Sequence, residues 1–262
     1  MATEVHEPKI SVIEVVKSFG DKRVLDGINL EVMPGESVVV VGGSGAGKTV
    51  LIKHMIGLLQ PDSGRVVMDG VDLATASPQA ALEVRKRCGM SFQEGALFDS
   101  MNVFDNVAFP IRRHRRDVGP PAVAARVREC LGLVRLAGIE GKMPAELSGG
   151  MLKRAAIARA LALGSHILLL DEPSAGLDPI TGANLDRTIL SLRDNLGLTF
   201  VVVTHELQSI YAIADRAVML DPKSRSIIAE GKPAVLRDTS TIPLVKQFFN
   251  RGADASHAAP GG

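Results

Sequence analysis

The chain has 262 residues, of which 46% are hydrophobic, so it can bury one large core or two unequal lobes. Its formal net charge of +1 excludes a general electrostatic field that would attract nucleic acid or an anionic membrane. Aromatic residues make up 3% of the chain, with one Tyr and no Trp, which argues against a surface on which nucleic-acid bases stack.

Strands are predicted first, over Ile10–Val16 and Val24–Met33, because apolar and β-branched residues dominate both runs. A turn at Phe19–Lys22 joins them, and a further strand is predicted at Arg65–Met68 between two turn sequences rich in Pro, Asp and Gly. Short strands separated by turns are typical of an antiparallel sheet, so we expect such a layer in the N-terminal part of the chain.

Residues Gly42–Thr49 read Gly-Gly-Ser-Gly-Ala-Gly-Lys-Thr and match the phosphate-binding pattern G-x-x-x-x-G-K-[ST]. An apolar strand at Val38–Val41 is predicted before the loop and a helix at Val50–Leu58 after it, which is the context that this pattern requires. The alternative, a glycine-rich turn with a chance Lys-Thr, does not explain that context.

The composition of this loop has a physical cause. Glycines let the backbone curl so that its N–H groups point at phosphate oxygens, and the start of the helix adds the positive end of its dipole. Lys48 is expected to reach the β- and γ-phosphates, and the Thr49 hydroxyl is expected to bind Mg²⁺. The candidate phosphate ligands are Gly42, Gly43, Ser44, Gly45, Ala46, Gly47, Lys48 and Thr49.

A helix at Pro78–Lys86 and a strand ending at Ser91-Phe92 are predicted next, followed by Gln93. An amide at the end of a strand can sense Mg²⁺ or the γ-phosphate and pass its position to the helices that follow. Gln93 is therefore a candidate both for metal contact and for catalysis.

Residues Val103–Leu136 are mostly helical in pattern, with breaks predicted at Pro110 and at Pro120-Pro121. Within this region, the basic run Arg112–Arg116 is interpreted as a solvated loop or a contact with a partner. A nucleic-acid site is the disfavoured alternative for that run.

A second candidate anion site lies at Ser148–Gly150, at the start of a helix predicted to run to about Leu163. Ser148 suits an N-cap, and the paired glycines Gly149 and Gly150 expose the backbone N–H groups of the helix start. Two phosphate-binding helix starts in one chain are consistent with a dimer in which each copy completes the nucleotide site of the other.

Helices and apolar strands alternate after residue 150, which predicts a parallel sheet covered on both faces. The predicted strands are Ile167–Leu170 and Thr199–Val203, with a helix at Ile180–Leu196 between them. Polar residues that follow such strands lie at one edge of the sheet, next to the phosphate-binding loop.

Asp171 follows the first of these strands and is expected to hold Mg²⁺, directly or through water. Glu172 is expected to activate the attacking water. His205, after the second strand, is placed to contact the γ-phosphate and to hold the water or Glu172. The alternatives are ordinary surface acids at a strand end and a structural histidine.

Phe19 is open to two interpretations on the sequence alone. Its ring can stack on adenine, a contact worth roughly 1–3 kcal/mol, or it can be an ordinary core residue.

No segment of the chain resembles a targeting or membrane-spanning sequence. The N-terminal residues are charged and lack the apolar centre of a signal peptide, and no apolar run approaches the roughly 20 residues needed to cross a bilayer. Cys88 and Cys130 have no metal-binding or redox spacing, so we expect two reduced core thiols in a cytosolic protein.

In order and spacing, these motifs resemble the nucleotide-binding subunit of an ABC transporter over residues of about 10–230. The motif set is Phe19, Gly42–Thr49, Gln93, Leu147–Gly150, Asp171-Glu172, Ser174–Asp178 and His205. The resemblance implies an α/β fold, a P-loop NTPase of ABC type with a RecA-like parallel-sheet core, an antiparallel β subdomain and an α-helical subdomain. It also implies that two subunits sandwich two ATP molecules head to tail with Mg²⁺, so that ATP closes the dimer and hydrolysis reopens it.

The resemblance implies a role for each motif. Phe19 would stack on adenine, Gly42–Thr49 would be the Walker A loop, and Gln93 would be the Q-loop residue that transmits motion to membrane subunits. Ser148–Gly150 would be the signature that caps the γ-phosphate bound by the other subunit. Asp171 would belong to Walker B with Glu172 as the catalytic carboxylate, Ser174–Asp178 would be the D-loop, and His205 the switch histidine. The implied boundaries are one ABC ATPase domain at residues 8–250, with the helical subdomain at about 94–163, and a flexible tail at 251–262.

A narrower resemblance is to the ATPases of Mce-type lipid transporters. It rests on Ala96–Phe98, Met101–Pro110, Ser148–Ala156 and Asp178–Thr181, with Met151 where the general ABC signature has Gln. It implies transport of phospholipids or other hydrophobic molecules across the bacterial envelope, energised from the cytoplasmic face of the inner membrane.

The partners implied by this narrower resemblance are a second copy of the chain, membrane permease subunits, a periplasmic Mce-domain lipid-binding protein and a small cytoplasmic regulatory subunit, but no nucleic acid. Three alternatives stay open on the sequence: a transporter subunit that serves a polar solute, a soluble ABC ATPase outside transport, and a nucleotide-binding module without turnover.

Overall fold

The computed structural model describes residues 7–92 and 96–255, with residues 251–255 described as backbone only. The smaller of two sheets consists of β1 (Ile10–Phe19), β2 (Lys22–Val32), β4 (Ser63–Met68) and β5 (Val71–Asp72), in the order β2-β1-β4-β5. Its neighbouring strands are antiparallel, which confirms the layer predicted for this part of the chain. β1 and β2 are longer than predicted, because Phe19 pairs directly with Lys22 and shortens the turn.

The larger sheet consists of β3 (Ser37–Gly42), β6 (Cys88–Ser91), β7 (Ile167–Asp171), β8 (Thr199–Val203), β9 (Arg216–Leu220) and β10 (Ile227–Gly231). Their order is β10-β9-β3-β8-β7-β6, and every neighbouring pair is parallel except β10 with β9. The predicted parallel core is confirmed. β9 and β10, which extend the sheet beyond β3, are not among the predicted strands.

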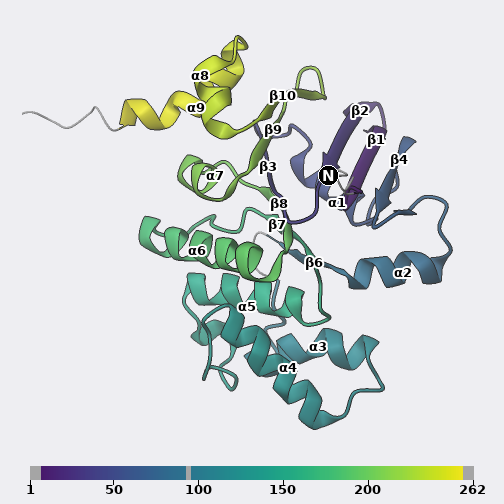
Figure 1. Cartoon of the computed structure of the whole chain (residues 1–262), viewed down its shortest axis with the longest axis vertical. Coiled ribbons are helices and arrows are strands. Elements are labelled where there is room, and N and C mark those ends of the chain that lie inside the picture. Colours follow the sequence, from purple (N-terminus) through teal and green to yellow (C-terminus); the bar gives the residue numbers. More distant parts are fainter. Residues whose placement is uncertain (1–6, 93–95, 256–262) are drawn as a thin grey trace, which may run out of the picture.

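Helices cover both faces of the larger sheet (Figure 1). They are α1 (Lys48–Met55), α2 (Pro78–Lys86), α3 (Val103–His114), α4 (Pro120–Leu133), α5 (Gly149–Leu161), α6 (Pro179–Leu196), α7 (Leu207–Ile213), α8 (Pro233–Thr239) and α9 (Pro243–Ala255), with a short 3₁₀ helix at Pro144–Glu146. α1 contacts both sheets, whereas α5, α6 and α7 lie on the opposite side of the larger sheet. α3 and α4 pack against α5 at the far end of the molecule from α8 and α9.

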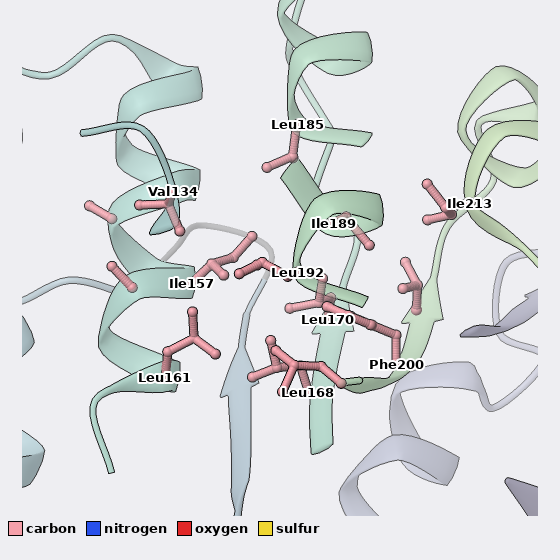
Figure 2. Close-up of a cluster of buried hydrophobic side chains, with 14 of the residues drawn as sticks. Val134, Ile157, Leu161, Leu168, Leu170, Leu185, Ile189, Leu192, Phe200 and Ile213 are labelled. Carbon is pink, nitrogen blue, oxygen red and sulfur yellow. The ribbon is translucent and has the colours of Figure 1, made fainter. Parts of the chain in front are cut away.

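The central strands of the larger sheet are buried on both faces. Along β7, Leu168 and Leu170 belong to one hydrophobic cluster, whereas Ile167 and Leu169 belong to the other, because alternate residues of a strand point to opposite faces. Figure 2 shows the first cluster, in which side chains of α5 and α6 meet those of β7 and Phe200 of β8. This two-sided burial explains the continuous apolar sequence of these strands.

The break predicted at Pro110 is wrong, since α3 continues through this residue. Proline inside a helix costs about 3 kcal/mol or more, but α3 buries Val107, Ala108 and Ile111 in the main core. Packing of this face outweighs the local cost. The break predicted at Pro120-Pro121 is confirmed, because α4 begins at Pro120, where a proline needs no N–H partner.

Cys88 and Cys130 are both buried and form no disulfide. Among the helices in the described part of the chain, none has the length and apolar character required to cross a membrane.

Candidate nucleotide-binding site

The loop between β3 and α1 has the conformation that its glycines predict. Gly42 has a φ of 149° and Gly47 a φ of 93°, a region that favours glycine. A Cβ on Gly42 would lie 2.4 Å from the carbonyl oxygen of Leu220, and one on Gly47 would lie 2.8 Å from Cδ2 of Leu25. Both conformation and space therefore require glycine at these two positions.

Lys48 begins α1 and folds back over the loop. Its Nζ donates hydrogen bonds to the carbonyl oxygens of Gly42 (2.9 Å) and Gly43 (3.1 Å). No side chain caps the start of α1, so N–H groups of its first turn are left for an anion. The loop can thus offer phosphate oxygens both backbone N–H groups and an ammonium group.

A cavity of about 370 Å³ lies beside the loop and is lined by Phe19, Lys22, Val24 and residues 45–50. The Phe19 side chain is 48% exposed, so the interpretation as a core residue is wrong. Lys22 and Val24 were not among the predicted site residues. The alternation of side chains along β2 could have identified them, because residues two apart lie on the same face of a strand.

Asp171 lies at the end of β7 and meets the start of α1. Its Oδ2 accepts a hydrogen bond of 3.0 Å from Oγ1 of Thr49. Asp171 is 7% exposed, and within the described ranges no basic side chain forms an ion pair with it. A hydroxyl and a carboxylate oxygen side by side fit Mg²⁺, which prefers oxygen ligands and takes few of them from protein.

Glu172 and His205 meet at the ends of β7 and β8, as the sequence predicts. Nδ1 of His205 lies 3.0 Å from both carboxylate oxygens of Glu172, so a protonated Nδ1 can donate to this carboxylate. The Glu172 side chain is 14% exposed and that of His205 is 64% exposed. The carboxylate is therefore sheltered, while the imidazole is largely open to solvent.

The backbone of Glu172 adopts a φ of 49°, which is unusual for a residue with a side chain. Such a conformation costs roughly 1–3 kcal/mol and is maintained only where the surroundings fix it. Here the N–H of Glu172 donates to the carbonyl oxygen of Val203 over 2.8 Å. The strained turn aims the carboxylate of Glu172 toward His205.

Ser148–Gly150 does not line the cavity beside the loop. Ser148 is the N-cap of α5, as predicted, and its Oγ accepts a hydrogen bond of 3.4 Å from the N–H of Met151. Ser148 and Gly149 are exposed, whereas Gly150 is buried against Thr181 at the start of α6. The structure thus separates the two predicted anion sites within one chain. The third predicted element, Gln93, lies outside the described residues.

Comparison with known proteins agrees with this geometry. The family described as ABC transporter matches residues 25–175. The chain belongs to the ABC transporter family. The relatives that it matches in that family are named as ATP-binding proteins.

Two relatives show how far the similarity extends. The chain is 42% identical to the intermembrane phospholipid transport system ATP-binding protein MlaF of Escherichia coli, over 94% of this chain and 90% of MlaF. It is also 42% identical to the probable ribonucleotide transport ATP-binding protein mkl of Mycobacterium tuberculosis, over 92% of this chain. The aligned part is 66% of mkl, so this ABC chain spans slightly less than two thirds of that relative.

Solved structures of ABC cassettes have the same fold. The dimeric post-hydrolysis state of the cassette MJ0796, bound to ADP and Pi, is similar with a TM-score of 0.76 and 29% identity, over 85% of this chain and 98% of MJ0796. CbiO1 from Clostridium perfringens is similar with a TM-score of 0.81 and 27% identity, over 96% of this chain and 98% of CbiO1. The fold class expected from the sequence is confirmed.

Proposed function

We propose that this chain binds ATP at Gly42–Thr49, works as a head-to-tail dimer and uses hydrolysis to drive lipid transport. The observation that carries the ATPase part is the convergence of three strand ends on the loop. β3 leads into the loop, β7 brings Asp171 to Thr49, and β8 brings His205 to Glu172. Phosphoryl transfer depends mainly on positioning and charge stabilisation, and this arrangement can provide both.

Each residue would then have a defined part in hydrolysis. Lys48 and the loop N–H groups would hold the β- and γ-phosphates, while Glu172 would accept a proton from the attacking water. His205 would orient Glu172 and the γ-phosphate. Phe19 would stack on the adenine at the open end of the cavity, with a contribution of roughly 1–3 kcal/mol. Gln93 would sense the γ-phosphate and pass its position to α3.

Mg²⁺ would be held by Thr49 and Asp171, directly or through water. The fit rests on their adjacent oxygen atoms, 3.0 Å apart, and on the absence of a basic ion-pair partner for Asp171 within the described part of the chain. When bound with ATP, the ion would offset the negative charge of the phosphates.

A second copy of the chain would complete each ATP site through Ser148–Gly150. This proposal is supported by the exposure of Ser148 and Gly149 at the start of α5, away from the loop of their own chain. The dimeric MJ0796 cassette bound to ADP and Pi supports it by similarity.

The dimer can be tested by disulfide trapping between Ser44→Cys and Ser148→Cys, both at exposed positions. We expect a crosslinked dimer with ATP in the doubly substituted chain and none without nucleotide. The native thiols provide a low background, because burial raises the pKa of Cys130 to about 11 and raises that of Cys88 further. Each single variant is the matched control, and equal crosslinking without ATP would contradict the proposed arrangement.

The cargo proposal rests on similarity to MlaF, which covers 90% of that relative. A lipid carrier of this class would place the chain on the cytoplasmic face of the inner membrane, bound to permease subunits. A periplasmic Mce-domain protein and a small regulatory subunit would complete the system. The basic run Arg112–Arg116, at the end of α3, would contact a partner or solvent through its exposed arginines, although Arg112 and Arg115 also form ion pairs with Asp105 and Asp117.

A second candidate cargo is a polar solute, because the chain is equally identical to mkl, named as a probable ribonucleotide transport protein. To decide, the tagged chain would be isolated from detergent-solubilised native membranes, and its partners and bound lipids would be identified. A permease with an Mce-domain protein and phospholipid supports lipid transport. A permease with a periplasmic solute receptor and no lipid overturns it, and no membrane partner would favour a soluble ABC ATPase.

A further inference from the structure

A groove of about 600 Å³ lies between α6 and α7, and a buried polar pair lines it. Oγ of Ser209, on α7, donates a hydrogen bond of 3.0 Å to Oδ2 of Asp186, on α6. Ser209 is 3% exposed and Asp186 is 6% exposed. No motif in the sequence predicts this pair, and the roles proposed above do not use it.

Both helices begin at segments that belong to the nucleotide site. α6 starts directly after Ser174–Asp178, and α7 starts just beyond His205. A hydrogen bond between Ser209 and Asp186 therefore ties the helix that follows His205 to the helix that follows the Walker B region.

α7 depends on tertiary contacts for its position. It has 7 residues, too few for a stable isolated helix, and its N-cap residue, Glu206, makes no side-chain capping hydrogen bond. At its C-terminal end, Arg193 contacts the carbonyl oxygen of Ile213 over 3.4 Å. In its first turn, the buried Ser209–Asp186 hydrogen bond supplies a fixed polar contact.

Glu172 and His205 are held in different ways. Glu172 is fixed by the larger sheet, since its N–H bonds to the carbonyl oxygen of Val203, and its side chain is largely buried. The His205 side chain is 64% exposed, so few neighbours hold the ring. His205 lies in the short segment between β8 and α7, so the position of its ring depends on both the end of β8 and the start of α7.

We propose that Asp186 and Ser209 are positioning residues for ATP hydrolysis, which hold α7 so that His205 reaches Glu172. This inference rests on the proposed function. Burial and the nearby charge of Glu206 raise the pKa of Asp186, although the hydrogen bond from Ser209 opposes them. Asp186 forms no ion pair in the described part of the chain, so Ser209 is the group that satisfies it.

The test compares Ser209→Ala in the wild-type background and in the His205→Ala background of the full chain. We expect Ser209→Ala alone to lower kcat for ATP about tenfold, as expected for one buried hydrogen bond that sets catalytic geometry. The KM for ATP should change less than about twofold, because the Gly42–Thr49 loop is untouched. In the His205→Ala background, Ser209→Ala should have no further effect on kcat, because both changes act through His205.

Two further variants separate positioning from stability. Asp186→Asn keeps an oxygen that accepts from Ser209, so it should retain kcat, whereas Asp186→Ala should lose as much as Ser209→Ala. Thr188→Val is the matched control on α6: it deletes a buried hydroxyl that bonds the carbonyl oxygen of Asn184 within the same helix. It should lower thermal stability without changing kcat.

Additive losses in the His205→Ala background would overturn the inference, as would an equal loss of kcat in Thr188→Val. An unchanged kcat in Ser209→Ala would overturn it as well, provided that the wild-type chain hydrolyses ATP and Glu172→Gln does not. If the wild-type chain and its membrane complex lack ATPase activity, the proposed function itself fails, and that outcome is distinct from failure of the Ser209–Asp186 inference.

Discussion

The starts of α1 and α5 look alike in the sequence but differ in what they need from the rest of the molecule. The loop before α1 is completed within one chain, where Lys48 bonds the loop carbonyls and Thr49 meets Asp171. The start of α5 is capped by its own Ser148, but it contributes nothing to the cavity beside the loop. The first site is assembled from one chain, through a contact between α1 and β7, whereas our proposal gives the second a role only through another copy of the chain.

The glycines of the two helix starts also have different causes. Gly47 has a φ of 93° and requires glycine for its conformation. Gly150 has no such φ, yet a Cβ there would lie 2.3 Å from Cγ2 of Thr181. The same residue type thus serves backbone geometry in one place and close packing of α5 against α6 in the other.

The largest effect is expected for a substitution that removes ATP hydrolysis without altering either helix start. Glu172→Gln should lower the rate of ATP hydrolysis by roughly 10²–10⁴-fold, because the proposed general base is lost. The affinity for ATP should stay unchanged, since neither helix start is altered. Phosphate release and equilibrium nucleotide binding provide the two measurements. Glu83→Gln, a change of the same kind in an α2 residue paired with Lys86, is the control, and a weaker affinity in Glu172→Gln would contradict the separation.

A paired substitution tests whether the first site works alone and the second only across a dimer. Lys48→Ala should weaken ATP binding by a single chain about 100-fold, as expected from the loss of charge-assisted hydrogen bonds to phosphate. Ser148→Arg should leave that affinity unchanged but prevent ATP-induced dimerisation, measured by light scattering. If Ser148→Arg weakens ATP binding by a single chain as much as Lys48→Ala does, the proposed difference between the two helix starts is wrong.

The smallest expected effect tests the packing role of Gly150. Gly150→Ala should lower the free energy of unfolding by about 1–3 kcal/mol through overpacking. Thr181→Ser removes the methyl group that a new Cβ would meet, so the double variant should regain most of the loss. Thr181→Ser alone is the control. Equal destabilisation by Gly150→Ala in both backgrounds, measured by denaturant unfolding, would show that Thr181 is not the cause.

Elements with strong local signals could be predicted closely. The predicted helix at Pro78–Lys86 has the observed bounds because Ser77 caps it and Pro78 occupies its first position. The strand Thr199–Val203 also has its predicted bounds, since its apolar run is buried on both faces. β9 and β10 were missed: β9 is a buried apolar strand of the same length as β8, and only β10 lies at the edge of the sheet, where its residues are partly exposed. The prediction at Pro110 was wrong because the local preference of proline to end a helix is outweighed by the packing of α3.

The sequence by itself determined the phosphate-binding loop and the polar residues that follow apolar strands. These features depend on neighbours along the chain, because a loop needs its glycines and a strand end needs its own polar residue. Only the tertiary structure decided how closely these residues meet. The Thr49–Asp171 and Glu172–His205 contacts, like Ser209–Asp186, join residues from different elements. Such distances are set by the packing of helices on the sheet, which no local pattern encodes.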